Sequence, residues 1–178
     1  MDEIKKIMFI CTGNTCRSVM AEGLLKKMLE DRNINDIEVY SAGLHASTGE
    51  YSTTSAIKVM NAQYDVNILN HQSVNVKNSP IKEMDLILCA THAQLTTLDY
   101  MYPELKPKMY TIKEFAYGDE VENKDIKDPW GYPEEVYKEC KRNIWGSRKN
   151  NRKNYKIIKT NVLKMLTFEN IFYIICKE

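Results

Sequence analysis

A chain of 178 residues with 43% hydrophobic and 28% charged side chains fits one soluble domain that can bury a core. It has no run of about eighteen apolar residues and no charged-then-apolar leader, which argues against a membrane span and against secretion. Five cysteines in such a chain favour reduced thiols over a disulfide framework. These features predict a cytoplasmic protein.

The net charge of +1 is unevenly distributed along the chain. Nine Lys or Arg residues and no acidic residue lie between Cys140 and Phe168, so the rest of the chain is acidic. A nucleic-acid-binding domain carries its basic face on the fold itself, so we expect no nucleic-acid partner.

The pattern of apolar residues predicts an alternation of strands and helices. In chain order we expect a strand over residues 4–10, a helix from 20 to about 33, a strand over 37–40, a helix over 54–64, a strand over 84–89, a helix over 92–100, a strand over 109–112 and a helix from 133 to about 144. This order implies right-handed crossovers and a parallel sheet covered on both faces, in one α/β domain. Ligands of such sheets bind beyond the carboxyl ends of the strands, where Cys11 falls.

The segment after the first strand, residues 11–18, reads Cys-Thr-Gly-Asn-Thr-Cys-Arg-Ser. A loop this short that closes onto a helix N-terminus turns its backbone N–H groups inward as an anion-binding nest. Gly13 and Asn14 are residue types that tolerate the positive φ angles such a loop needs. The residues expected to bind phosphate are Thr12, Gly13, Asn14, Thr15, Cys16, Arg17 and Ser18.

Three side chains of this loop predict its chemistry. The Arg17 guanidinium can donate two hydrogen bonds to phosphate oxygens, which a lysine cannot do. The same positive field favours the thiolate of Cys11, and the Ser18 hydroxyl can donate a hydrogen bond to that sulfur. The loop therefore predicts a nucleophilic cysteine inside a phosphate-binding site.

Other interpretations of the loop fit less well. A nucleotide-binding P-loop would require a Gly-Lys-Ser/Thr sequence, which does not follow. A zinc site would require a second cysteine or a histidine pair at ligand spacing. A structural interpretation makes Cys11 a buried residue at a strand end and Arg17 a surface residue, but the strand–loop–helix context disfavours it. We expect no metal and no cofactor.

With this loop directly after its first strand, the chain resembles the low-molecular-weight protein tyrosine phosphatase family as far as about Asn143. The resemblance implies a four-stranded parallel sheet in the order 2-1-3-4 between helices, with a two-step reaction through a phosphocysteine. It implies an enzyme acting on phosphorylated proteins, with a phosphatase domain over residues 1–145. The sequence does not define the oligomeric state, and a monomer is favoured. Residues 146–178 depart from the family as a basic tail, interpreted as an appended or frame-shifted segment or as an amphipathic helix that docks on a membrane surface or partner.

A reaction of this kind needs an acid to protonate the leaving group and then a base to activate water. Asp128 in the sequence Asp128-Pro129-Trp130 is the candidate for both roles, and the family's acid lies in a matching Asp-Pro-aromatic motif. Pro129 stiffens the segment, and Trp130 offers an apolar wall that favours the protonated carboxyl group. An Asp-Pro pair alone is also a common turn.

Further residues are expected to support the site. Asn14, Ser41 and His71 match family positions that form hydrogen bonds behind the loop. Cys16 could form a disulfide with an oxidised Cys11 and protect it from further oxidation; the alternative is a small residue packed beneath the loop.

Thr15 bears on the substrate. Tyrosine-directed members of the family tend to have isoleucine at the position just before Cys16. With Thr15 at that position, this chain resembles a bacterial branch that dephosphorylates arginine side chains. An apolar wall would leave guanidinium N–H groups unpaired, at about 1–3 kcal/mol each. Thr15 and Trp130 are therefore the expected specificity residues, and phosphoarginine in proteins is favoured over phosphotyrosine.

Two rival functions remain. A thioredoxin-coupled arsenate reductase shares this fold and loop, but it needs further cysteines to pass a disulfide outward. Cys89 lies near the start of such a path, yet Thr96 and Thr97 stand where its partner is expected. A binding module without catalysis would not need both Cys11 and Asp128.

Overall fold

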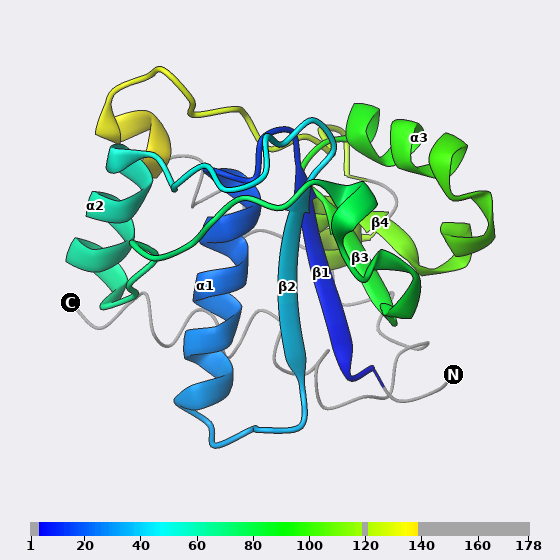
Figure 1. Ribbon diagram of the computed structural model, residues 1–178, viewed down its shortest axis with the longest axis horizontal. Helices are drawn as coiled ribbons and strands as arrows, with labels where there is room; N and C mark the ends of the chain where they lie inside the picture. Colours follow the sequence, from blue (N-terminus) through cyan, green and yellow to red (C-terminus); the bar gives the residue numbers. More distant parts are fainter. Residues whose placement is uncertain (1–3, 119–120, 139–178) are drawn as a thin grey trace.

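A four-stranded sheet forms the centre of the protein in a computed structural model that describes residues 4–118 and 121–138 (Figure 1). The strands are β1 (Lys6–Cys11), β2 (Glu38–Gly43), β3 (Leu86–Cys89) and β4 (Met109–Thr111). They lie in the order β2-β1-β3-β4, and each neighbouring pair is parallel. The predicted α/β class and strand order are confirmed.

All helices except α4 and the short 3-10 helices follow the predicted alternation. The helices are α1 (Arg17–Glu30), α2 (Thr54–Tyr64), α3 (His92–Met101) and α4 (Ile112–Tyr117), with short 3-10 helices η1 (Val76–Asn78), η2 (Ile81–Glu83) and η3 (Pro103–Lys108). Residues 134–138 are helical as well, and the rest of the predicted last helix and the basic tail lie outside the described residues.

Helix α4 is the element that the sequence interpretation missed, and the strand predicted to reach residue 112 ends one residue earlier. Thr111 accepts a hydrogen bond from the backbone N–H of Glu114, whose side chain accepts one from the backbone N–H of Thr111. This reciprocal capping box starts a helix, so Ile112 leaves the sheet.

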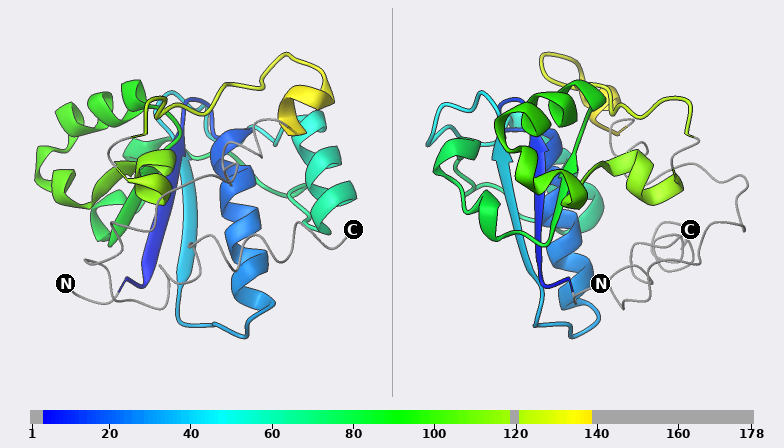
Figure 2. Two further views of the ribbon diagram at one scale, coloured as in Figure 1. Left: turned by 180° about the vertical axis from the view of Figure 1, so that it is seen from behind. Right: turned by 90° about the vertical axis from the view of Figure 1, so that its right-hand side faces the viewer.

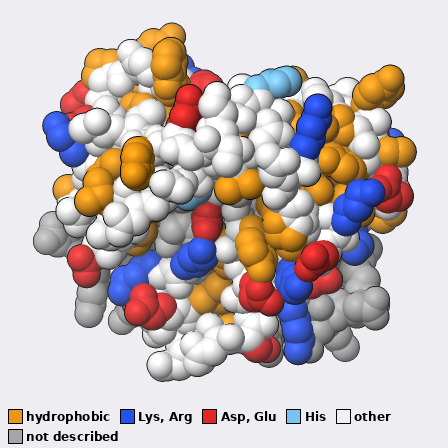
Figure 3. Space-filling view, viewed as in Figure 1, with side chains coloured by type: hydrophobic (Ala, Val, Ile, Leu, Met, Phe, Trp, Pro, Cys, Tyr) orange, Lys and Arg blue, Asp and Glu red, His pale blue; other side chains and the backbone are white. Residues whose placement is uncertain are grey.

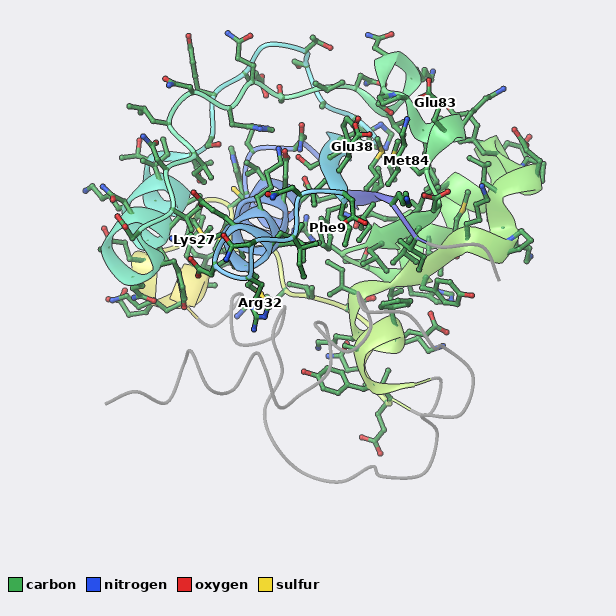
Figure 4. The ribbon with its side chains drawn as sticks, turned by 90° about the horizontal axis from the view of Figure 1, so that it is seen from below. Phe9, Lys27, Arg32, Glu38, Glu83 and Met84 are labelled. Atoms are coloured by element: carbon green, nitrogen blue, oxygen red, sulfur yellow. The ribbon has the colours of Figure 1, made fainter. Side chains whose placement is uncertain are left out.

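The two faces of the sheet bury different helices. Successive strand residues point to opposite faces, so Ile7 and Phe9 of β1 pack with α1 and the start of α4, whereas Met8 and Ile10 pack with α3 and the 3-10 helices. Figure 4 shows Phe9 and Met84 on opposite sides of the sheet. This double cover explains why the strands are almost continuously apolar.

A third apolar cluster joins α2 to α1, and Tyr137 is buried in it. Figure 2 shows from two sides how the chain from residue 121 crosses the carboxyl ends of the strands and reaches α2. The chain around α1 and the chain that ends at Tyr137 therefore come together near the carboxyl ends of the strands.

The described part of the chain has two further features. Within residues 4–118 and 121–138, no helix has the length and apolar character needed to cross a membrane. On the face shown in Figure 3, acidic and basic side chains are interspersed rather than gathered into a single-sign patch.

Candidate active site

The thiol of Cys11 lies at the carboxyl end of the central strand β1, where it is 2% exposed. Its Sγ is 3.0 Å from the Ser18 hydroxyl oxygen and accepts a hydrogen bond from the backbone N–H of Asn14 at 3.2 Å. Two polar donors thus surround a buried sulfur. Such an arrangement stabilises negative charge on that sulfur.

Asn14 organises the loop from within. Its φ angle of 56° lies in the left-handed region, which asparagine tolerates better than most residues. The side-chain amide donates to the hydroxyls of Ser18 at 2.9 Å and Ser41 at 2.7 Å, and its oxygen accepts from the backbone N–H of Val74 at 2.9 Å. Because Asn14 donates to Ser18, the Ser18 hydrogen is free to point at the sulfur of Cys11.

The remaining predicted supports also meet at the loop. His71 Nε2 lies 3.0 Å from the backbone oxygen of Asn14, and the Ser41 hydroxyl donates to the Glu22 carboxylate. Gly13, the other residue of the loop that tolerates a positive φ, does not adopt one. A Cβ atom there would meet only the Thr15 hydroxyl, at 3.7 Å, so Asn14 alone provides the left-handed turn of this loop.

The end of β2 presses directly against the loop. A Cβ atom on Gly43 would lie 2.6 Å from the carbonyl oxygen of Thr12 and 2.9 Å from the backbone nitrogen of Asn14, so only glycine fits. The backbone N–H of His45 donates to that same Thr12 oxygen at 2.9 Å. The neighbouring strand therefore fixes the shape of the loop.

Arg17 begins α1 and points back across the mouth of the site, with a side chain that is 5% exposed. Its Nη2 donates to the Asp128 carboxylate at 2.5 Å and to the Thr12 hydroxyl at 3.4 Å, and its Nη1 donates to the carbonyl oxygen of Ile126 at 3.3 Å. The Nε atom is buried without a hydrogen-bond partner. The guanidinium is thus held in place while retaining donor capacity.

The structure brings Asp128 to the loop, although its side chain is half exposed. The backbone N–H of Trp130 donates to the second carboxylate oxygen at 3.2 Å. Trp130 is 66% exposed, so the apolar wall that we expected beside the carboxylate is not formed by a buried ring. Pro129 itself is buried.

Cys16, which precedes α1, is buried beneath the loop, whereas Thr15 is partly exposed. The Sγ of Cys16 lies 3.3 Å from the Thr53 hydroxyl and 3.6 Å from the Tyr137 hydroxyl. Burial raises the pKa of Cys16, which favours its protonated thiol. Cys11 and Cys16 are both free thiols in the structure.

Sequence reasoning missed two residues that contact this network. Gln94 is buried in α3 and donates from its amide to the Thr12 hydroxyl at 3.0 Å. Its pairing with Thr91 three residues earlier is a visible capping pattern, but the reach to Thr12 depends on the tertiary fold. Glu22 lies one helical turn after Ser18, so its position facing the loop follows from helix geometry.

The donor set around Cys11 is suited to an oxyanion. Within the described ranges, 4–118 and 121–138, no group of three or more His, Cys, Asp or Glu residues could hold a metal ion. The structure places the Asn14 N–H, the Arg17 guanidinium and the Asp128 carboxylate around the Cys11 thiol, and together these groups can bind a phosphoryl group, attack it and transfer a proton.

Comparisons with known proteins agree with this chemistry. A protein-arginine-phosphatase of Bacillus subtilis (strain 168) is 33% identical over 135 residues, covering 76% of this chain and 86% of the relative. A low molecular weight protein-tyrosine-phosphatase of Staphylococcus aureus (strain bovine RF122 / ET3-1) is 30% identical over 125 residues, covering 70% and 77%. A solved arginine phosphatase, a cysteine-to-serine mutant with a phosphorylated active-site serine, superposes with a TM-score of 0.71 at 30% identity, covering 78% of this chain and 88% of its own. The family model of the low molecular weight phosphotyrosine protein phosphatases matches residues 6–156, and this chain belongs to that family.

Proposed function

We propose that this phosphatase works through a covalent phosphocysteine at Cys11 and that its preferred substrate is phosphoarginine in proteins. The observation that carries the mechanism is the environment of the Cys11 sulfur, which faces the Asn14 N–H and the Ser18 hydroxyl at the mouth of an anion-binding loop. A phosphoserine at the active site of the solved cysteine-to-serine relative supports transfer to this position.

In the first step, the thiolate of Cys11 attacks phosphorus, so that an S–P bond forms as the P–N bond of phosphoarginine breaks. The loop N–H groups and the Arg17 guanidinium bind the phosphoryl oxygens. Asp128 gives its proton to the leaving guanidine nitrogen, which departs as a neutral group. Its contact with Arg17 supports this role, because it places the carboxyl group beside the guanidinium that would bind phosphate.

In the second step, Asp128 accepts a proton from water as the water oxygen attacks phosphorus. The S–P bond breaks, its electron pair returns to Cys11, and the Ser18 hydroxyl stabilises the departing thiolate. The products are inorganic phosphate and the restored enzyme. A reduced thiol is required throughout, which supports a cytoplasmic location.

The alternative of arsenate reduction receives little support. It needs a second cysteine that can attack an oxidised Cys11 and then pass the disulfide on. Cys89 is fully buried in the opposite apolar cluster, and burial raises its pKa, so its thiolate is scarce.

Thr15 supports phosphoarginine as the substrate. It is partly exposed in the loop and offers a hydroxyl to a guanidinium group, whose N–H donors need acceptors. The similarity to the Bacillus subtilis protein-arginine-phosphatase agrees with this choice. Phosphotyrosine is the second candidate, favoured by the exposed Trp130 ring, on which a phenyl ring can stack, and by the Staphylococcus aureus relative.

The test compares kcat/KM on matched phosphoarginine and phosphotyrosine peptides for the wild type, Thr15→Ile and Thr15→Val. We expect the wild type to prefer phosphoarginine, and Thr15→Ile to shift the ratio toward phosphotyrosine by about tenfold or more. Thr15→Val is the matched control, because it keeps the shape of threonine and removes only the hydroxyl.

Cys11→Ser provides the blank, with no turnover on either peptide. A wild type that prefers phosphotyrosine would overturn the arginine assignment while leaving the cysteine chemistry intact. Retained turnover in Cys11→Ser would overturn the phosphocysteine mechanism itself.

A further inference from the structure

The segment that carries Asp128 is fixed to the body of the protein at two buried points. Ile126 is fully buried, with its N–H donating to the Ala90 oxygen at 2.8 Å and its own oxygen accepting from Arg17. Tyr137 is 2% exposed. Most residues between these two points are exposed, Pro129 excepted. The segment that carries the acid is therefore anchored at both ends.

The hydroxyl of Tyr137 is buried against two other polar groups. The Thr53 hydroxyl donates to it at 3.2 Å, and the Sγ of Cys16 lies 3.6 Å from it. The same sulfur lies 3.3 Å from the Thr53 hydroxyl. The three groups can each donate one hydrogen to the next, which forms a closed ring with every member satisfied.

This ring joins three segments that are distant in sequence. Cys16 belongs to the phosphate loop, Thr53 caps the start of α2, and Tyr137 lies in the helix after the acid segment. The backbone N–H of Thr53 also donates to the Thr15 oxygen at 3.0 Å, which fixes the cap to the loop. Burial raises the pKa of Tyr137 to about 12, so its hydroxyl keeps its proton across the working range of the enzyme.

We propose that Tyr137 is a positioning residue for the reaction, because its buried hydroxyl fixes the far end of the acid segment to the phosphate loop. This inference rests on the proposed function, in which Asp128 is the acid. Ile126 and Tyr137 bracket the carboxyl group, and loss of the second anchor allows Asp128 to move away from the leaving group. The cradle around Cys11 keeps its own hydrogen bonds.

Loss of the Tyr137 hydroxyl should change the kinetics in a way that general damage to the site would not. Leaving groups of high pKa need a proton from Asp128, whereas leaving groups of low pKa depart as anions without one. Tyr137→Phe should therefore slow the first class selectively. A distorted phosphate loop would instead slow both classes and weaken phosphate binding.

The experiment measures kcat/KM for a series of aryl phosphates that differ in leaving-group pKa, together with inhibition by inorganic phosphate. For Tyr137→Phe we expect a loss of about tenfold at the high-pKa end, little change at the low-pKa end and unchanged phosphate inhibition. Tyr100→Phe, which removes an exposed hydroxyl from α3, is the matched control and should behave as the wild type.

The double variant with Asp128→Asn tests whether the effect runs through the acid. Once Asp128→Asn has removed the proton donor, Tyr137→Phe should cause little further loss. An equal loss across the substrate series, or a full additional loss in the double variant, would overturn the proposal.

Two further results keep the test decisive. If Tyr137→Phe fails to fold, Thr53→Asn removes the hydroxyl from the ring but keeps a good helix cap, and it should show the same selective loss. If Asp128→Asn itself leaves the dependence on leaving-group pKa unchanged, Asp128 is not the acid, which overturns its role in the proposed reaction and this inference with it.

Discussion

The phosphate loop and the acid segment are held in different ways. In the loop, the Asn14 side chain alone makes three hydrogen bonds to groups from three separate places in the chain, and Gly43 leaves no space behind it. In the acid segment, most side chains are exposed, and Asp128 is held by Arg17 and by the N–H of Trp130. The first region is fixed by many contacts and the second by few.

This difference matches the tasks that the two regions have in the proposed reaction. A phosphoryl group is the same in every substrate, so a rigid cradle can be complementary to it. The leaving group varies with the substrate and must enter and depart, so the acid needs a segment that can move. Arg17 contacts both regions. A bound phosphoryl group would therefore compete with Asp128 for its guanidinium.

Asp128→Asn should have the largest effect, because it removes the acid and leaves the phosphate loop intact. Loss of the acid should lower kcat/KM for peptides by roughly two to four orders of magnitude. Because the competing carboxylate is removed from Arg17, inorganic phosphate should bind more tightly. Steady-state kinetics with phosphate as inhibitor checks both effects, and weaker phosphate binding would contradict the competition.

Asn14→Ala should have an intermediate effect and acts on the rigid region. Ser18, Ser41 and the backbone of Val74 each lose a partner, and alanine is strained at a positive φ. We expect thermal stability to fall and kcat/KM to drop about 10- to 100-fold for all leaving groups alike.

Asn14→Gly is the matched variant, because glycine accepts the positive φ but makes no side-chain hydrogen bonds. Its stability should lie between those of the wild type and Asn14→Ala. If the two variants were equally stable, backbone strain would contribute nothing at this position.

Pro129→Gly should have the smallest effect and loosens the acid segment without removing any donor. Extra backbone freedom beside Asp128 should lower kcat/KM about two- to fivefold for substrates that need a proton. Phosphate inhibition should not change. Pro107→Gly, in η3 and exposed, is the control, and an equal loss in that variant would assign the effect to general stability.

The sequence predicted the phosphate loop better than the acid segment. The loop and its strand–helix context are local patterns, whereas the strand order was implied only by the family resemblance, and the structure confirms that order. That Asp128 lies beside Arg17 was foreseeable only through the Asp-Pro-aromatic motif of the family. Contacts of Gln94 and Tyr137 could not be foreseen, because they depend on how α3 and the last helix pack. The sequence named Gly13 and Asn14 as residue types that tolerate a positive φ, and only the structure shows that Asn14 is the one that adopts it.

The sequence distances between the two regions have a consequence for synthesis of the protein. The Arg17–Asp128 and Cys16–Tyr137 contacts span 111 and 121 residues, whereas the bond from Asn14 to the Cys11 sulfur spans 3. Contacts between distant residues require closure of a long loop and form only after the intervening chain is available. Synthesis therefore makes the residues of the phosphate loop available well before the acid, so a nascent chain contains the residues that would bind phosphate before it contains those that would release it.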